Sequence, residues 1–229
     1  MTQVGVGEFT MGTPLREIIE TVGGGTRPGH TIRAVLQGAA AAIITADHLD
    51  TPASWEGMQA IGSGLGAAAF IVLDDATDIA AVGASVSRFL AVESCGQCSP
   101  CKLDGLRMAE LLDAATRGEA VTNDLDELRS RIAKVADGAR CSLATQQQVV
   151  AASLLEAFPA DIAAHLERNA PPTTPYLVAE LGDIDDDGVA RVDEHHADKQ
   201  PDWTYDRQDS GKTPAARLGE HREPQALDE

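Results

Sequence analysis

The chain has 229 residues, of which 43% are hydrophobic and 3% aromatic, and its formal net charge is −18. This length and composition are typical of a folded protein with an aliphatic core and argue against disorder throughout. The strong negative charge would repel nucleic acid and anionic membrane surfaces, so we expect no nucleic acid among its partners.

The N-terminal residues, MTQVGVGEFTMG, lack a basic flank followed by an apolar run, which argues against a secretory signal. No stretch approaches the roughly 20 apolar residues that span a bilayer. We therefore expect a cytoplasmic protein without direct membrane insertion, one that reaches the periphery of the inner membrane only through partners. In a reducing compartment its four cysteines are more typical of metal ligands or redox groups than of disulfides.

The first region, residues 1–74, has the pattern of a small mixed domain. Residues 12–25 predict a short helix, with Thr13 in position to cap it. The apolar runs 31–38 and 70–74 predict strands, and glycine, serine and alanine residues lie between them.

Residues 75–170 predict four helices joined by short connections, which favours a bundle. Apolar residues recur at helical spacing in each of the four segments. The expected limits, in chain order, are Asp75 or Thr77 as the first cap, Thr116 as the end of the second helix, Asn123 and Gly138 around the third, and Cys141 to about Ile162 for the fourth.

Residues 171–229 predict an acidic, partly disordered tail. They hold 15 Asp or Glu residues against 6 Lys or Arg, and they begin with the linker-like sequence PPTTP. The runs 176–184 and 189–194 predict a hairpin around the turn DDDG. Beyond Tyr205 the sequence lacks periodicity and indicates an unstructured end.

One part of this tail also matches a calcium loop. The pattern is formally complete in Asp183, Asp185, Asp187, Gly188 and Glu194. Such a loop needs a helix on each side, whereas here valines, a glycine and a proline cluster surround it. An acidic hairpin turn therefore accounts for the same residues.

The histidines and aromatic residues of the tail leave two further questions. His195 and His196 have no other candidate metal ligands beside them, which favours a solvated polar face. Trp203 and Tyr205 stand out because aromatic residues are scarce in this chain. They are either exposed anchors for a partner protein or side chains that pack back on the chain's own helices.

The chemistry is concentrated in the stretch ESCGQCSPCK, residues 93–102, which places Cys95, Cys98 and Cys101 at three-residue intervals. Structural zinc sites usually bring their ligands as two separated pairs, whereas CxxCxxC with one remote cysteine is a common ligand set for a 4Fe–4S cluster. With Cys141 as the remote ligand, the spacing predicts one such cluster. A cluster whose irons are all held by protein has no open position for substrate, so we expect electron transfer rather than catalysis.

The residues around these cysteines suit an anionic cluster. Gly96 allows the backbone to pass close to it. Helix starts at Cys101 and Cys141 would direct backbone N–H groups toward the sulfurs. Lys102 and Arg140 either add positive charge or lie exposed on the surface.

The cysteine stretch and Cys141, with the upstream segments MGTPLREII, AVLQG, DHLDTP, GSGLG and FIVLD in that order, resemble the C-terminal half of the flavoprotein subunit of NADH dehydrogenases over about residues 8–168. That family includes the NADH-oxidising subunit of respiratory complex I and related subunits of NAD-dependent formate dehydrogenases and NAD-reducing hydrogenases. The resemblance implies an α+β fold: a β-grasp domain of the soluble-ligand-binding type, then a four-helix bundle with one 4Fe–4S cluster on Cys95, Cys98, Cys101 and Cys141.

The resemblance also implies partners. In the family this cluster accepts electrons from FMN, which NADH reduces, and passes them to a further iron–sulfur subunit. The family's FMN and NADH part precedes these domains, and residues 23–29, although rich in glycine, follow a helix and indicate a helix stop. We therefore expect no FMN or NAD on this chain alone, and a separate flavin-containing subunit as partner. Lys102 in place of the usual arginine, and GAAAA at 38–42 in place of a Gly/Ser-rich loop, depart from the family.

Two functions are compatible with this sequence. The first is an electron-transfer subunit of an NADH-dehydrogenase-type complex, with the cysteines holding an iron–sulfur cluster. The second is a zinc-stabilised β-grasp module for binding or scaffolding. Neither the terminal substrate nor the direction of electron flow is determined by these residues.

Overall fold

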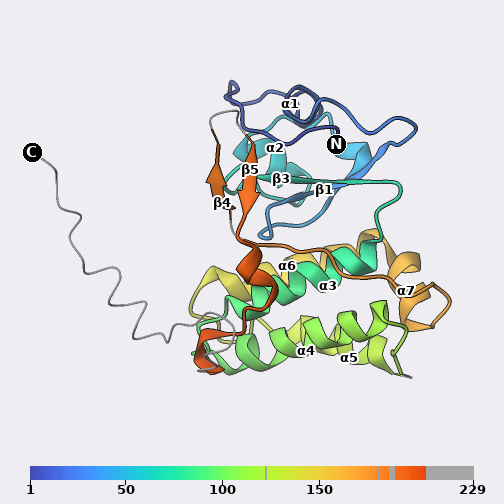
Figure 1. Cartoon of the computed structure of the whole chain (residues 1–229). Helices are drawn as coiled ribbons and strands as arrows, with labels where there is room; N and C mark the ends of the chain where they lie inside the picture. Colours follow the sequence, from blue (N-terminus) through green and yellow to red (C-terminus); the bar gives the residue numbers. More distant parts are fainter. Residues whose placement is uncertain (122, 180, 186–188, 205–229) are drawn as a thin grey trace, which may run out of the picture.

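The computed structural model describes residues 1–121, 123–179, 181–185 and 189–204. In this part of the chain, a three-stranded sheet lies between a small N-terminal helix and a layer of longer helices (Figure 1). The expected mixture of helix and sheet is confirmed.

The sheet consists of β1 (Ile32–Gln37), β2 (Ile44–Thr45) and β3 (Phe70–Asp74) in the order β2-β1-β3. Both neighbouring pairs are antiparallel. The strands expected from the runs 31–38 and 70–74 are confirmed. The two residues of β2 are too few to produce a recognisable alternation in the sequence.

The sheet is buried on both faces, which explains the continuous apolar run of its central strand. In β1, Ala34 and Leu36 belong to a core shared with the long helices, whereas Val35 belongs to a core shared with the N-terminal helix. Leu73 of β3 joins the first of these cores and Val72 packs against the second. Neighbouring residues of a strand therefore pack into the cores on opposite faces of the sheet, as the two-residue period of a strand requires.

The short helices of the first region are α1 (Leu15–Gly23), η1 (Ala46–His48) and α2 (Trp55–Ala60). The expected cap at Thr13 is wrong, because its hydroxyl donates to the Thr10 carbonyl and Pro14 occupies the cap position. Gly24 ends α1 with a left-handed φ of 64°. The glycine-rich stretch after this helix thus acts as the helix stop that the sequence indicated.

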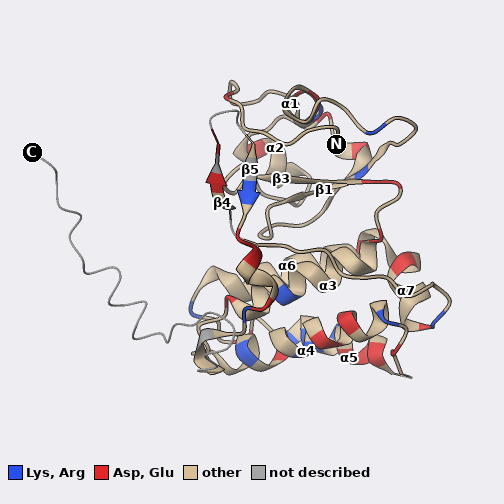
Figure 2. Ribbon diagram, in the orientation of Figure 1, with Lys and Arg blue, Asp and Glu red and all other residues tan. Residues whose placement is uncertain are grey.

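The long helices, together called the helical layer below, lie beneath the sheet in two rows (Figure 1), with α3 and α6 nearer to it and α4 and α5 farther away. Helix α3 packs against α4 and also against α6. Acidic and basic residues both occur on the outer helices, α4 and α5 (Figure 2). Arg107 of α4 pairs with Glu127 of α5, and Arg131 of α5 pairs with Asp104 of α4. The helices are α3 (Ile79–Val92), α4 (Ser99–Thr116), α5 (Asp124–Lys134), α6 (Ser142–Ala157) and α7 (Pro159–Leu166).

Two details of this layer differ from the expectation. Asp78, rather than Asp75 or Thr77, caps α3 by accepting a hydrogen bond from the Ala81 N–H. The fourth expected helix breaks at Phe158, and Pro159 begins a separate helix bent by 94° from α6. Proline is favoured in a first helical turn and has no N–H with which to continue the preceding helix.

No single helix among the described residues is long and apolar enough to cross a membrane. Helices α6 and α7 reach that length only as a pair, across the bend between them.

Polar contacts join the sheet region to the helical layer. Arg33 of β1 forms an ion pair with Asp161 of α7 at 2.7 Å and lies over the Phe158 ring at 4.8 Å from its centroid. The Ile43 N–H donates to the Ser153 hydroxyl at 3.0 Å. The two regions therefore share a hydrophobic core and are also joined by polar contacts. The division into domains at residues 74 and 170 stays a prediction.

The last described segment runs along α3 and forms a hairpin beside the sheet before it returns to the helical layer (Figure 1). Its elements are β4 (Leu181–Ile184), β5 (Ala190–Val192), η2 (Glu194–Ala197) and η3 (Asp202–Thr204). The antiparallel hairpin is confirmed, although most of its DDDG turn lies outside the described residues. So does the end of the chain beyond Thr204, for which we predicted disorder.

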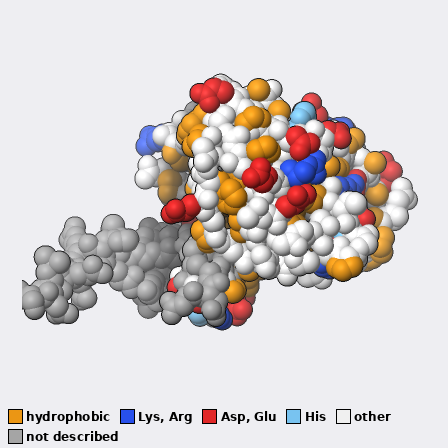
Figure 3. All heavy atoms as spheres, turned by 90° about the horizontal axis from the view of Figure 1, so that it is seen from above, with side chains coloured by type: hydrophobic (Ala, Val, Ile, Leu, Met, Phe, Trp, Pro, Cys, Tyr) orange, Lys and Arg blue, Asp and Glu red, His pale blue; other side chains and the backbone are white. Residues whose placement is uncertain are grey.

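On the face of the molecule shown in Figure 3, the apolar side chains of the described residues lie scattered among acidic and basic ones. The cysteines lie away from this face, where α3 ends and α4 and α6 begin.

Candidate metal centre

All four cysteines line one small cavity of about 80 Å³ at the end of the helical layer where α3 stops and α4 and α6 begin. Cys95 lies in the loop after α3, Cys98 occupies the cap position of α4, and Cys101 lies in the first turn of that helix. Cys141 occupies the cap position of α6. The structure thus brings together the four residues that the sequence singled out, from segments forty residues apart.

Local backbone chemistry explains how this loop turns so sharply. Gly96 has a φ of 75°, in the left-handed region that glycine adopts without strain. Pro100 lies in the first turn of α4, where its missing N–H costs nothing. Two of the cysteines, Cys98 and Cys141, precede helices whose first N–H groups have no intrahelical acceptor. Such helix starts favour anionic sulfur.

The four thiols differ in their exposure. Cys101 is buried, with 6% of its surface exposed, whereas Cys95 and Cys141 are exposed and Cys98 is intermediate. Burial raises the pKa of the Cys101 thiol; a hydrogen bond with the Ser94 hydroxyl opposes that rise, and the other three cysteines add to it. The other three cysteines therefore lie close enough to Cys101 to affect the pKa of its thiol.

The spacing of the sulfurs distinguishes two kinds of metal site. Tetrahedral zinc with Zn–S bonds of about 2.3 Å would hold its sulfurs roughly 3.8 Å apart. A cubane carries one iron at each of four separated corners, so its thiolates stand farther apart. Four cysteines that line one cavity can supply the ligands of either kind of site.

Two side chains that the sequence did not single out contact the buried sulfur. The Ser94 hydroxyl lies 3.5 Å from the Cys101 sulfur, and Gln147 Nε2 of α6 lies 3.9 Å from it. Both residues are buried. No spacing rule relates Gln147 to the cysteine stretch, so only the packing of α6 against α4 reveals it.

The two basic residues near the cysteines have different environments. The Lys102 ammonium lies 4.0 Å from the centroid of the Trp203 ring, a cation–π distance. Arg140 is exposed, lines the cavity and donates to the Gln97 side chain at 3.4 Å. Lys102 is therefore not simply solvated, while Arg140 combines exposure with a position beside the cysteines.

Trp203 packs on the cysteine loop of its own chain. A Cβ atom at Gly96 would lie 2.6 Å from the indole ring, so the ring occupies the space that this glycine leaves open. The indole nitrogen is buried and has no hydrogen-bond partner among the described residues. Of the two alternatives for this tryptophan, packing on the chain's own helices is the one observed. Tyr205 lies outside the described residues.

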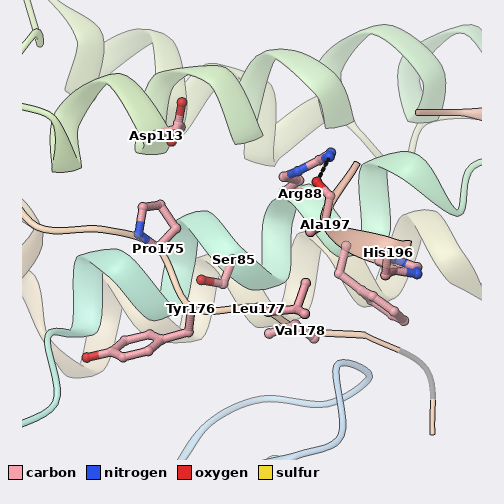
Figure 4. Close-up of a pocket in the computed structure, with 10 residues that line it drawn as sticks. Ser85, Arg88, Asp113, Pro175, Tyr176, Leu177, Val178, His196 and Ala197 are labelled. Carbon is pink, nitrogen blue, oxygen red and sulfur yellow. Dashed lines mark hydrogen bonds between the residues drawn. The ribbon is translucent and has the colours of Figure 1, made fainter. Parts of the chain in front are cut away.

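Residues 193–204, called the strap below, are held against α3 and the residue after it by polar contacts. Lys199 pairs with Glu93, and both side chains are largely buried. Arg88 donates to the carbonyls of Ala197 and Lys199 at 2.9 Å each. The strap covers a cavity of about 250 Å³, lined by Arg88 and Ala197 among others (Figure 4).

The expected solvated face at His195 and His196 is wrong for one of the two. His195 is exposed and contacts the Asp193 carboxylate at 3.0 Å. His196 is buried and stacks on Phe89, with 5.0 Å between ring centroids, and its Nε2 lies 3.5 Å from Glu93. The η2 turn directs two neighbouring side chains in opposite directions, which a linear sequence does not reveal.

The acidic hairpin lacks the framework of a helical calcium loop. Strand β4 overlaps the start of the pattern and β5 lies inside it, and the short turn η2 begins at Glu194, whereas a calcium hand has a helix on each side of its loop. The Asp185 carboxylate accepts the Val189 N–H at 2.9 Å and pairs with Arg191 at 3.1 Å. Asp187 and Gly188 lie outside the described residues. The observed contacts are those of the hairpin turn that the sequence also allowed.

A second group of potential ligands, His30, Asp74 and Asp75, lies in the sheet region. Its members are already paired: His30 contacts Asp75 at 2.8 Å, and Arg27 hydrogen-bonds Asp74. The Arg27 hydrogen bond is the main reason why the pKa of Asp74 is lowered to about 2. This group is an ion-paired corner rather than a metal site.

The helical layer matches a known family. Residues 81–165 match the family described as the NADH-ubiquinone oxidoreductase-F iron–sulfur binding region. The matched segment contains all four cysteines, and it ends before the strap that carries Trp203.

Individual relatives agree with this match. The chain is 32% identical over 165 residues to an F-type subunit of the NADH-quinone oxidoreductase of Rhizobium meliloti (strain 1021), covering 71% of this chain and 39% of the relative. It is also 32% identical over 166 residues to the HndC subunit of the NADP-reducing hydrogenase of Solidesulfovibrio fructosivorans, covering 72% of this chain and 34% of that protein. The chain thus spans about two fifths or less of the length of these curated relatives.

A solved structure supports the fold. The crystal structure of an NAD⁺-reducing [NiFe]-hydrogenase in the H₂-reduced state aligns with a TM-score of 0.60 at 23% identity, over 69% of this chain and 26% of that one. At this identity the likeness concerns the fold alone. The resemblance inferred from the sequence, to the C-terminal half of these subunits, is confirmed.

Proposed function

Because the chain carries the iron–sulfur binding region of the NADH-ubiquinone oxidoreductase-F family, we propose that it is an electron-transfer subunit of an NADH-dehydrogenase-type complex. It relays single electrons through one 4Fe–4S cluster between a flavin and NAD(H) site on another chain and a further iron–sulfur subunit. In this proposal the sheet region is the β-grasp domain of the family, and helices α3 to α6 are its four-helix bundle.

The observation that carries the proposal is the convergence of all four cysteines on one cavity. Cys95, Cys98, Cys101 and Cys141 would hold the cluster, which supplies reversible one-electron chemistry when bound. Since every cysteine of the chain is used, no thiol remains for nucleophilic catalysis. The residues of this chain bind and orient, and they carry out no bond-breaking step of their own.

The proposed ligands differ in exposure, and this difference indicates which side of the cluster would face the partner subunits. Cys101 is buried against Ser94, which follows α3, and Gln147 of α6, while Cys95 and Cys141 lie at the surface. Electron exchange with other subunits should therefore occur at the surface of Cys95 and Cys141. Arg140 and Gln97 lie beside this edge and would contact a docked partner.

The proposed partners follow from the relatives. Those proteins are named as subunits of an NADH-quinone oxidoreductase and an NADP-reducing hydrogenase. By analogy we propose a flavin-containing, NADH-binding subunit and at least one further iron–sulfur subunit as partners.

Metal and sulfide analysis of the purified chain tests the proposal. We expect about four irons and four sulfides per chain, and a brown colour that a reductant bleaches. One zinc ion per chain without colour would overturn it and would favour the zinc-stabilised binding module instead. Identification of the co-purifying subunits by mass spectrometry then tests the choice of partners.

A further inference from the structure

Among the four cysteines, Cys101 has a distinct environment. It is the buried ligand, and it is also the sulfur approached by two side-chain hydrogen-bond donors. Resting on the proposed function, we infer that Ser94 and Gln147 donate hydrogen bonds to the Cys101 sulfur and thereby raise the reduction potential of the cluster that this sulfur helps to hold.

The orientation of the Ser94 hydroxyl follows from its second contact. The Gly96 N–H donates to the Ser94 oxygen at 3.3 Å, so that oxygen already accepts one hydrogen bond. Ser94 is 3% exposed, which excludes water as an abundant alternative partner. A thiolate that binds a cluster has no proton to donate. The Ser94 hydroxyl, whose oxygen lies 3.5 Å from the Cys101 sulfur, is therefore the donor in this contact.

The orientation of the Gln147 amide is also determined by a neighbour. Its Nε2 donates to the Leu90 carbonyl at 3.1 Å, and exchanging the amide nitrogen and oxygen would set two acceptors against each other. The second hydrogen of the same nitrogen is available to the Cys101 sulfur at 3.9 Å. The carbonyl end of α3 thus holds the donor in place beside the ligand.

A glycine makes room for this amide. Gly105 lies one helical turn after Cys101 on α4, and a Cβ atom there would lie 2.4 Å from Gln147 Oε1. Gln147 is 2% exposed, and its Oε1 is buried without a hydrogen-bond partner among the described residues. A buried amide with an unpaired oxygen is costly, and its opposite end meets the ligand sulfur.

The effect on the potential follows from charge. A reduced cluster carries one more negative charge than an oxidised one, and part of that charge lies on the sulfur ligands. Donors aimed at a ligand therefore stabilise the reduced form more than the oxidised form. This opposes burial, which disfavours the more highly charged state.

The test is a redox titration of the chain with its cluster in place, monitored by absorbance and by electron paramagnetic resonance. Gln147→Met keeps an unbranched side chain of similar length but has no donor, and Ser94→Ala removes one hydroxyl. We expect each variant to retain about four irons per chain and to have a more negative potential, and the double variant a more negative potential still.

Matched controls separate this effect from general changes in packing. Gln148 neighbours Gln147 on α6, but its amide donates to the carbonyls of Ile132 and Ala133. Ser85 is buried on α3 and donates to the Ala81 carbonyl. Gln148→Met and Ser85→Ala should leave the potential unchanged.

The possible outcomes are distinct. A potential that is unchanged or more positive in both Gln147→Met and Ser94→Ala, with iron content intact, would overturn this inference and leave the proposed function standing. If Gln147→Met fails to hold its iron, the reduction potential of Ser94→Ala is the deciding measurement, and an unchanged or more positive value would overturn the inference. Absence of iron from the unmodified chain would instead overturn the proposed function.

Discussion

The helical layer and the C-terminal strap meet at the same cysteine loop but are held in different ways. Helices α3 to α6 pack through buried aliphatic side chains that recur at helical spacing. The strap from Asp193 to Thr204 is held by an ion pair, carbonyl contacts to Arg88, and two ring contacts. The family match covers the first region and ends before the second. The layer therefore supplies the four cysteines of the candidate metal site, and the strap packs on the loop that carries three of them.

The largest expected effect is loss of the cluster from the helical layer itself. Cys98→Ser removes one of the four proposed ligands, so iron content should fall below about four per chain and electron transfer should stop. Ser99→Ala, at the neighbouring exposed position, is the control and should retain the iron. Full iron content in Cys98→Ser, measured by elemental analysis, would contradict the ligand assignment.

The next largest effect concerns the stability of the layer. Leu154 of α6 is 1% exposed and packs in the main core, whereas Leu103 of α4 is 58% exposed although it shares the apolar pattern of that helix. Leu154→Ala should lower the free energy of unfolding by about 2–5 kcal/mol, because it leaves a cavity. Leu103→Ala should change it by less than about 0.5 kcal/mol. Urea denaturation measures both, and equal losses would contradict the packing described here.

A smaller and local effect is expected in the strap. Lys199→Met leaves Glu93 without its ammonium partner in a mostly buried position, so the strap should detach more often. Hydrogen exchange of residues 193–204 should accelerate by about tenfold or more, while that of α4 stays unchanged. Lys134→Met, at the exposed end of α5, should accelerate neither. Uniform acceleration throughout the chain would show that the strap and the layer unfold together.

The smallest effect is expected at the tip of the strap. Trp203→Ala removes the ring from Gly96 and Lys102, and because this ring is only half-buried the change in unfolding free energy should be about 1–2 kcal/mol or less. Loss of iron in air should become a few-fold faster as the loop opens to solvent. Trp55→Ala, on the other tryptophan, which is 66% exposed, should not change that rate. Identical iron loss in both variants would rule out a protective role for Trp203.

Much of the helical layer could be predicted from the sequence because its signals are local. Periodic apolar residues placed α3, α4 and α5 close to their observed positions, and the cysteine spacing singled out the four residues that line one cavity. The break between α6 and α7 also had a visible signal in Pro159, but the apolar pattern continued across it and concealed the bend.

Other features have no local signal. Asp78 caps α3 in place of its acidic and threonine neighbours, and its second oxygen also reaches His165 of α7, at 2.8 Å. Gln147 and Ser94 meet Cys101 only because three helices converge, and the strap reaches Gly96 only after the chain has passed along the sheet. Contacts between residues far apart in the chain depend on how elements pack, which no periodicity encodes.

The amino-acid sequence by itself determined that the four cysteines are the candidate metal ligands. Their spacing limits the candidate cofactors to a 4Fe–4S cluster or a zinc ion. Only the tertiary structure decided how those sulfurs differ, with Cys101 buried beside two donors and Cys95 and Cys141 exposed. The physical reason is that ligand identity is a property of single residues. Burial and hydrogen bonding of a ligand, by contrast, arise from every element packed around it.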